Sequence, residues 1–190
     1  MDNYQHKYFK YKNKYENLKA QRQNKLEPMF DSGNGDKQVK RHLALCEILN
    51  FEGANKLNWD IIRQIYDPNV KVIMPDGTEI SGIEKHIELM KIMYNMAPDI
   101  KIISHGIQFG SGDWTVVTQN MSGTFTGIFK THMGKNINPT GNKFEIQVCS
   151  LIKWKNYRII EERVFSDDAY FNKQLGISSC DLLNQMQNKI

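Results

Sequence analysis

The sequence lacks the features that most directly identify a protein class. Only three cysteines occur in 190 residues, Cys46, Cys149 and Cys180, and none has the CxxC spacing. A disulfide framework or a zinc site is therefore not expected, and a reducing compartment fits best. No apolar run approaches the ~20 residues that a membrane span needs. The Lys/Tyr-rich N-terminus has no apolar stretch typical of a secretory signal, so we expect a cytoplasmic protein that does not span a membrane.

Charge is distributed unevenly along the chain. Hydrophobic residues make up 40% and charged residues 24%, which is ordinary for a globular protein. The formal net charge is +4, yet residues 1–25 contain seven basic and two acidic residues, a net of +5. The rest of the chain therefore sums to −1. The body has no basic surplus for nucleic acid, whereas the N-terminal segment does.

The first 26 residues carry an aromatic stripe. Tyr4, Tyr8, Tyr11, Tyr15 and Leu18 recur at heptad spacing, which places them on one face of a helix. We predict that residues 1–26 form a basic helical tail that docks on an anionic partner, with a helix packed on its own domain as the alternative. Residues 27–35, rich in Gly, Pro, Asp and Ser, are predicted to be a linker.

The remaining pattern places helices before long strands. Helical periodicity covers residues 36–53, 59–66 and 81–96, with turns predicted at 67–69 and 75–77 around a strand at 70–74. Four long strands follow at 100–109, 114–125, 144–154 and 157–165, the last two joined by a hairpin at Lys155-Asn156. Helices are predicted at 167–176 and 177–190. This order is typical of an α+β fold.

Three segments carry a family resemblance. They are "SGTFTGIF" at 122–129, "NPTGNKFEIQVCSLIKWKNYRIIEERVFSDD" at 138–168 and "YFNKQLG" at 170–176. Together they resemble the SnoaL-like polyketide cyclase family, within the nuclear transport factor 2-like superfamily, over residues 36–176. The resemblance implies a cone-shaped, curved antiparallel sheet wrapped on helices, whose open end forms a pocket.

Several polar positions of the family pocket are not polar here. The resemblance implies acid–base catalysis by a pocket carboxylate helped by histidine, without a metal or other cofactor. At family histidine positions this chain has Ile73, Phe125 and Ser150, and at the position of the catalytic aspartate it has Val164. Isoleucine, phenylalanine and valine side chains cannot transfer a proton, so the family mechanism does not carry over directly.

Two carboxylates remain as catalytic candidates. Glu162 lies where many relatives have histidine, and strand alternation predicts that it shares a face with Ile160 and Val164. It could act as a base there, or it could be an exposed or ion-paired strand residue. Asp167 matches an aspartate common in the family at the strand–helix junction, with a helix N-cap as the alternative. His105 and His132 are further candidates.

The residues expected to contact a ligand are mainly apolar or aromatic. We predict a small apolar molecule bound by a set that also includes one serine: Trp114, Phe125, Ser150, Val164 and Tyr170. The predicted function is a pocket protein, either an altered lyase or isomerase or a ligand carrier, and whether it is an enzyme stays open. The alternative is a non-catalytic dimerisation or adaptor module. That module would form a homodimer through outward residues such as Cys149 and Leu151.

The tail also resembles viral sequences. "YFKYKNKYENLK" at 8–19 is similar to N-terminal segments of giant DNA virus proteins. This similarity suggests a viral protein located in the host cytoplasm or the virion.

Overall fold

The computed structural model describes residues 37–130 and 136–177. The predicted tail (1–26), the linker (27–35) and nearly all of the predicted C-terminal helix (177–190) lie outside these residues, as do His132 and the viral resemblance. The chain divides into two compact units, Met1–Gly35 and Asp36–Ile190, and only the second is described here. Its described part contains no helix with the length and apolar character of a membrane span.

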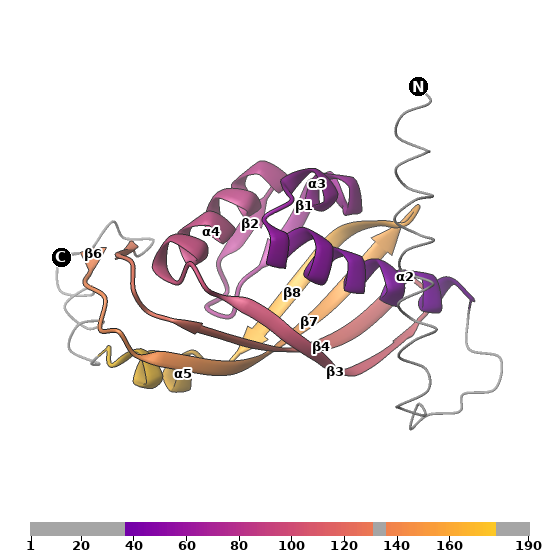
Figure 1. The fold of residues 1–190 in the computed structure, drawn as a ribbon. Coiled ribbons are helices and arrows are strands. Elements are labelled where there is room, and N and C mark those ends of the chain that lie inside the picture. Colours follow the sequence, from indigo (N-terminus) through magenta and orange to yellow (C-terminus); the bar gives the residue numbers. More distant parts are fainter. Residues whose placement is uncertain (1–36, 131–135, 178–190) are drawn as a thin grey trace. The chain divides into compact units, whose positions relative to one another are not determined.

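Helices come before the long strands, as the sequence predicts (Figure 1). The helices are α2 (Lys37–Glu47), α3 (Trp59–Ile65), α4 (Ile83–Met96) and α5 (Asp168–Leu175), with a π-helix η1 (Ile48–Gly53) and a 3-10 turn η2 (Ala54–Lys56). The strands are β1 (Tyr66–Ile73), β2 (Glu79–Ser81), β3 (Lys101–Ser111), β4 (Trp114–Thr124), β5 (Phe129–Lys130), β6 (Asn136–Ile137), β7 (Lys143–Lys155) and β8 (Arg158–Ser166).

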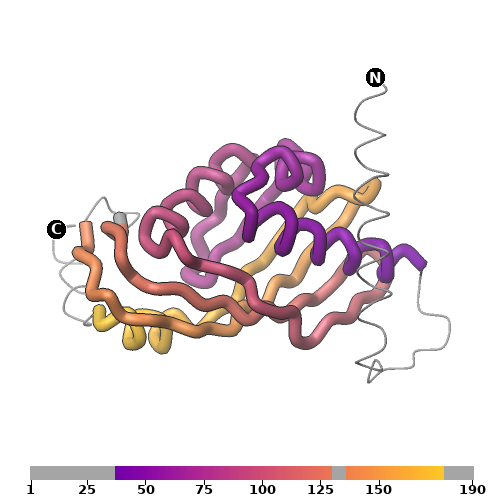
Figure 2. Tube along the Cα trace, in the orientation of Figure 1, coloured from indigo at the N-terminus to yellow at the C-terminus, as the bar shows by residue number. Residues whose placement is uncertain are grey.

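Six strands form one curved sheet in the order β2-β1-β8-β7-β4-β3. All neighbours are antiparallel except β1 and β8, which are parallel. Helices α2, α3 and α4 lie over one face of the sheet, and the tube in Figure 2 shows how the long strands curve beneath them. The α+β fold is thus confirmed, with more strands than the four long ones predicted.

The two faces of the sheet differ in burial. On β4 and β7 the residues that face the helices are buried, for example Val117 and Ile152, and we call this side the inner face. The alternate residues of β7 are exposed or half-buried and form the outer face: Glu145, Gln147, Cys149, Leu151 and Lys153. This alternation is the period-two pattern expected of a sheet covered on one side.

Two apolar clusters fill the space between helices and sheet. One brings α2, α3 and α4 onto the inner face around Ile62, Val117 and Trp154. The other lies at the end of α4 and the start of β7, around Met96 and Phe144. Burial of this apolar surface is the main force that holds the helices on the sheet.

Two turns differ from their predicted form. Asp67 to Asn69, predicted as a turn before the strand, lie within β1, where the pairing with β8 shifts register between Tyr66 and Lys71. Asn69 N–H donates to the Asp67 side chain at 2.9 Å. The hydrogen bond typical of an Asx turn is therefore present, but it lies within a bulge of β1. The β7–β8 turn is centred on Asn156-Tyr157 rather than on Lys155-Asn156.

Both turn residues have left-handed backbones, as a two-residue type I′ hairpin requires. The φ angles are 51° for Asn156 and 61° for Tyr157. An aromatic residue is unfavourable there, but the Arg41 guanidinium lies 4.2 Å from the centre of the Tyr157 ring and helps to hold it.

Gly127, the last glycine of "SGTFTGIF", lies directly against the end of α4. Its N–H donates to the Met96 carbonyl at 2.9 Å, and a Cβ at this position would overlap the carbonyl oxygen of Asn95. A side chain is therefore excluded by the close approach of two backbones.

We expect Gly127→Ala to lower the free energy of unfolding by about 1–3 kcal/mol, because the added methyl group must displace the α4 backbone. Urea denaturation measures the change. The neighbouring variant Ile128→Ala removes an exposed side chain and should be within about 0.5 kcal/mol of the wild type. Equal stability of the two variants would contradict the close approach.

Candidate functional site

Glu162 lies on the inner face of β8, buried to 6% exposure. A register shift in the β7–β8 pairing explains its orientation. Trp154 pairs with Ile159 and Lys153 with Glu161, so Ile160 is an extra residue in β8. As a result Ile159 and Glu162 both face inward, and the predicted shared face of Glu162 with Ile160 is wrong.

One oxygen of Glu162 is held by a tyrosine. The Tyr66 hydroxyl donates to Glu162 Oε2 at 2.5 Å, and both side chains are buried. Tyr66 is the first residue of β1, which pairs with β8 in parallel, and this pairing brings together two residues that are 96 positions apart. A short bond from a phenol to a carboxylate is among the stronger hydrogen bonds in proteins.

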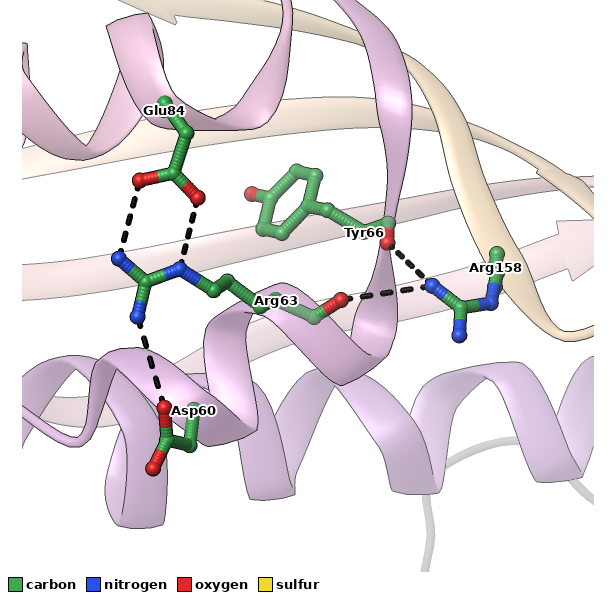
Figure 3. Close-up of polar contacts among 5 residues, drawn as sticks. All are labelled: Asp60, Arg63, Tyr66, Glu84 and Arg158. Carbon is green, nitrogen blue, oxygen red and sulfur yellow. Dashed lines mark hydrogen bonds and ion pairs between the residues drawn. The ribbon is translucent and has the colours of Figure 1, made fainter.

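The start of β1 is fixed by charged groups on its surface side (Figure 3). Arg63 on α3 makes two hydrogen bonds to the Glu84 carboxylate on α4, at 2.7 and 2.9 Å, and a longer one to Asp60. Arg158 Nη1 donates to the backbone carbonyls of Tyr66, at 3.0 Å, and Arg63, at 3.4 Å. These contacts position the backbone from which the Tyr66 side chain extends to Glu162.

The other groups near Glu162 are neutral. Burial raises the pKa of the Tyr66 hydroxyl, and the negative charge of Glu162 raises it further. Burial, again with help from Glu162, raises the pKa of the Cys46 thiol. Burial lowers the pKa of His86, against the opposing influence of Glu162. The His86 ring lies 5.4 Å from the Tyr66 ring, and its Nδ1 is enclosed without a hydrogen-bond partner.

Among the described residues, no cation is buried with the carboxylate. The buried polar residues of the described chain are His42, Asn50, His86, Thr115, Gln119, Ser150 and Glu162, with no lysine or arginine among them. Burial contradicts the alternative that Glu162 is an exposed residue, and none of the ion pairs found among the described residues includes it. A buried carboxylate without a cation needs hydrogen bonds or water for its stability.

The second oxygen of Glu162 lacks a partner among the described residues and is not fully enclosed. It makes no hydrogen bond in the described residues, and it is not among their enclosed side-chain atoms that lack a partner. The same holds for the hydroxyl of Ser150 and the amide of Gln119, whose residues are 2% and 8% exposed. All three groups therefore reach space that a water molecule can enter.

The inner-face register relates these groups to one another. Glu162 pairs with Ile152, and Ser150 pairs with both Val164 and Val117. Glu162 and Ser150 are thus diagonal neighbours, about 7–8 Å apart at the backbone. The structure brings Glu162, Ser150 and Val164 of the predicted site onto one face.

The other predicted site residues lie elsewhere. Phe125 is fully buried in the second apolar cluster. Trp114 alternates with buried Thr115 on β4 and lies on the outer face, where Lys153 Nζ is 5.2 Å from its ring centre. Asp167 is exposed and accepts a hydrogen bond from Tyr170 N–H at 2.8 Å, which makes it the N-cap of α5. Tyr170 is 52% exposed.

Sequence reasoning missed Tyr66 and Gln119. The sequence pattern predicts Tyr66 at the end of a helix, whereas the long-range pairing of β1 with β8 directs its hydroxyl to Glu162. Gln119 offered a signal that could have been used, because alternation along β4 places it with the apolar residues Val117 and Met121. A polar residue on an apolar strand face is a candidate site residue.

Two surface hollows lie away from Glu162. One is bordered by residues 56–60 and Arg63, and the other by Asp99, residues 122–124 and 143–145, and Gln174. Both are open to solvent and contain none of the predicted ligand-binding residues. Within residues 37–130 and 136–177, no three His, Cys, Asp or Glu side chains meet in a way that would hold a metal ion.

Comparison with known proteins identifies the family. The model of the SnoaL-like polyketide cyclases matches residues 47–175, and the chain belongs to this family. No match was found among curated proteins.

Solved structures share the fold at low sequence identity. A protein from Jannaschia sp. CCS1 assigned to the SnoaL-like polyketide cyclases is 20% identical with a TM-score of 0.66, over 80% of this chain and 99% of that one. IdmH from Streptomyces antibioticus, assigned as a polyketide cyclase, is 21% identical with a TM-score of 0.60, over 71% and 98%. AclR from Streptomyces galilaeus, assigned as a hydroxylase, is 16% identical with a TM-score of 0.61, over 74% and 87%.

Removing the Tyr66 hydroxyl should destabilise the fold. Tyr66→Phe leaves a buried carboxylate oxygen without its donor, which costs about 1–3 kcal/mol of unfolding free energy. The double variant Tyr66→Phe/Glu162→Gln should recover part of this loss, because the unpaired charge is gone. Urea denaturation of the four members of the cycle measures the coupling. Strictly additive effects would contradict the bond.

Stability should fall as the solution becomes mildly acidic. Burial lowers the pKa of His86 and His105 below 6.5. Below pH 6.5 the unfolded chain binds protons that the folded chain does not, so stability is lost between that pH and the folded-state pKa values. The slope is up to about 1.4 kcal/mol per pH unit for each histidine.

Urea midpoints measured between about pH 7.5 and about pH 5.5 test this dependence. The His86→Gln variant should show a shallower slope than the wild type. A wild-type stability that does not change over this range would contradict the prediction.

Proposed function

We propose that the domain binds a small, mainly apolar molecule against the inner face of the sheet, with Glu162 as the proton acceptor of an acid–base reaction. One observation carries this proposal. The carboxylate is buried, one oxygen is held by Tyr66, and the other has no hydrogen-bond partner among the described residues and is not fully enclosed. A base needs such a fixed and reachable oxygen.

The chemistry follows from the groups present. Glu162 takes a proton from a carbon next to a carbonyl group, and the electron pair of the broken C–H bond moves to the carbonyl oxygen to form an enolate. Return of the proton at another atom completes an isomerisation. Tyr66 stays protonated and orients the carboxylate, because burial raises the pKa of its hydroxyl. The polyketide cyclase assignments of structural neighbours agree with this class of reaction.

Hydrogen–deuterium exchange of 2-tetralone tests the reaction directly. The protein should accelerate exchange at the carbon between the ring and the carbonyl group, and Glu162→Gln should reduce the acceleration by about 100-fold or more. The matched control is Glu161→Gln, the same change at the next residue, which lies half-buried beside Arg163. Asp167→Asn in this assay tests the second carboxylate candidate.

Circular dichroism verifies that each variant is folded. A folded Glu162→Gln variant that exchanges 2-tetralone as fast as the wild type would contradict the role of Glu162. So would wild-type protein with no effect on exchange.

A second candidate function is self-association through the outer face. Large apolar side chains are exposed there, with Phe109 at 58% and Phe165 at 53%. The strand register joins them in one band, because Phe109 pairs with Val116, Val116 with Leu151, and Phe165 with Cys149. An exposed apolar band of this kind is typical of an interaction surface, and a second copy of the chain is its proposed partner.

Light scattering at micromolar concentration tests this association. The wild type should be a dimer, and Phe109→Lys should shift it to monomer, because a charge at an apolar contact is costly to bury. Leu57→Lys, a similar change at an exposed residue outside the sheet, should leave the dimer intact. A monomeric wild type would contradict the proposal.

A further inference from the structure

A second polar group lies on the inner face, away from Glu162. It consists of Asn50 on η1, His105 on β3 and Gln119 on β4. His105 and Gln119 are cross-strand partners, and Asn50 Nδ2 lies 2.9 Å from His105 Nε2. Asn50 and Gln119 are 6% and 8% exposed. Three residues from three elements therefore form one contiguous cluster.

His105 fixes the cluster and stays neutral. Burial lowers its pKa, and the Phe51 ring packs 4.9 Å from the imidazole. A neutral imidazole accepts the Asn50 amide hydrogen at Nε2, and its Nδ1 is enclosed without a partner. Asn50 itself lies in a π-helix, and such segments occur often at functional sites.

The amide groups are incompletely bonded although they are buried. The side chain of Gln119 makes no hydrogen bond in the described residues, and the oxygen of Asn50 makes none either. Neither group is among the enclosed atoms without a partner. Buried amides normally find partners, so these two are available to a ligand.

The distance between Gln119 and Glu162 sets the length of a ligand that contacts both residues. Gln119 is a diagonal neighbour of Ser150, and Ser150 is a diagonal neighbour of Glu162. Two diagonal steps correspond to about 15 Å along the inner face at the level of the backbone. A ligand that reaches both ends is therefore elongated.

The charges on the inner face determine which chemical class of ligand can bind there. Neutral donors and acceptors form one end, where the Glu47 carboxylate is close enough to oppose the effect of burial on the pKa of His105. The Glu162 carboxylate occupies the other end, and no lysine or arginine is among the buried residues of the described chain. An anionic ligand would have to lose its hydration without a compensating cation and would be repelled by Glu162. Phosphate esters, thioester carriers bearing phosphates, and free carboxylates are thus excluded.

We propose that Asn50, His105 and Gln119 form a second ligand subsite, which hydrogen-bonds an uncharged carbonyl or carboxamide group of an elongated, electrically neutral molecule. This inference rests on the proposed function in placing the ligand on the inner face. It adds a residue-level contact and a charge requirement that do not depend on whether Glu162 transfers a proton.

Binding of 2-naphthamide, followed by NMR at neutral pH with the full chain, tests the subsite. The probe should shift the side-chain amide resonances of Gln119, which are assigned by their loss in Gln119→Met. We expect that variant to bind 2-naphthamide about tenfold more weakly while its affinity for naphthalene is unchanged. Gln147→Met, the same change at an exposed residue on the outer face, should bind both probes as the wild type does.

Two ligands test the proposal without a mutation. 2-Naphthoate should bind wild-type protein at least about tenfold more weakly than 2-naphthamide, and N,N-dimethyl-2-naphthamide should also bind more weakly, because it cannot donate to the amides. These comparisons remain decisive if Gln119→Met does not fold. Equal binding of 2-naphthoate, no binding of 2-naphthamide at millimolar concentration, or equal losses in Gln119→Met and Gln147→Met would overturn the subsite.

Glu162→Gln separates the two proposals. It should retain 2-naphthamide binding within about threefold, since Gln119 lies two diagonal steps away. If 2-tetralone exchange fails while Gln119-dependent binding persists, the acid–base proposal is wrong and the subsite stands. If exchange occurs but 2-naphthamide binding does not depend on Gln119, the subsite is wrong and the acid–base proposal stands.

Discussion

The candidate site depends on one constraint, a buried carboxylate that has no buried cation beside it in the part of the chain that the structure describes. Removing Glu162 from water is costly unless hydrogen bonds replace the lost hydration. The Tyr66 hydroxyl supplies one such bond at 2.5 Å, and neutral Cys46 and His86 complete the surroundings. An apolar residue of similar volume would be expected to stabilise the fold at least as well. Stability alone therefore does not account for the arrangement, which agrees with the acid–base role proposed for Glu162.

The position of Tyr66 depends on groups far from Glu162. The ion pair between Arg63 and Glu84 connects α3 to α4, and Arg158 holds the backbone at the start of β1 (Figure 3). Surface ion pairs of this kind contribute little stability by themselves. Their effect here is geometric, because they fix the backbone that carries the tyrosine. The chemistry proposed for the inner face would thus depend on contacts on the solvent side of the helices.

Much of the fold could be predicted because it is encoded locally. Strand alternation, the α4 periodicity and the turn residues indicated the long strands and helices of an α+β domain. The N-cap alternative for Asp167 also followed from local chemistry and describes its contacts in the structure.

The site was less predictable because it depends on pairing between distant segments. The bulge at Ile160 changes which residues of β8 face inward. No local sequence pattern indicates this bulge. The parallel pairing of β1 with β8 brings Tyr66 to Glu162 across 96 residues. Trp114 resembled a pocket residue by type, but one step of alternation places it on the outer face. Face assignment at single-residue precision needs the register, which the sequence alone does not supply.

A high-resolution crystal structure at neutral pH is the most direct test of the central claim, namely that unpaired polar groups on the inner face reach a space open to small molecules. The account predicts ordered water or ligand density within hydrogen-bond distance of the free Glu162 oxygen, the Ser150 hydroxyl and the Gln119 amide. Apolar side chains packed directly over these three groups, with no density between them, would contradict it.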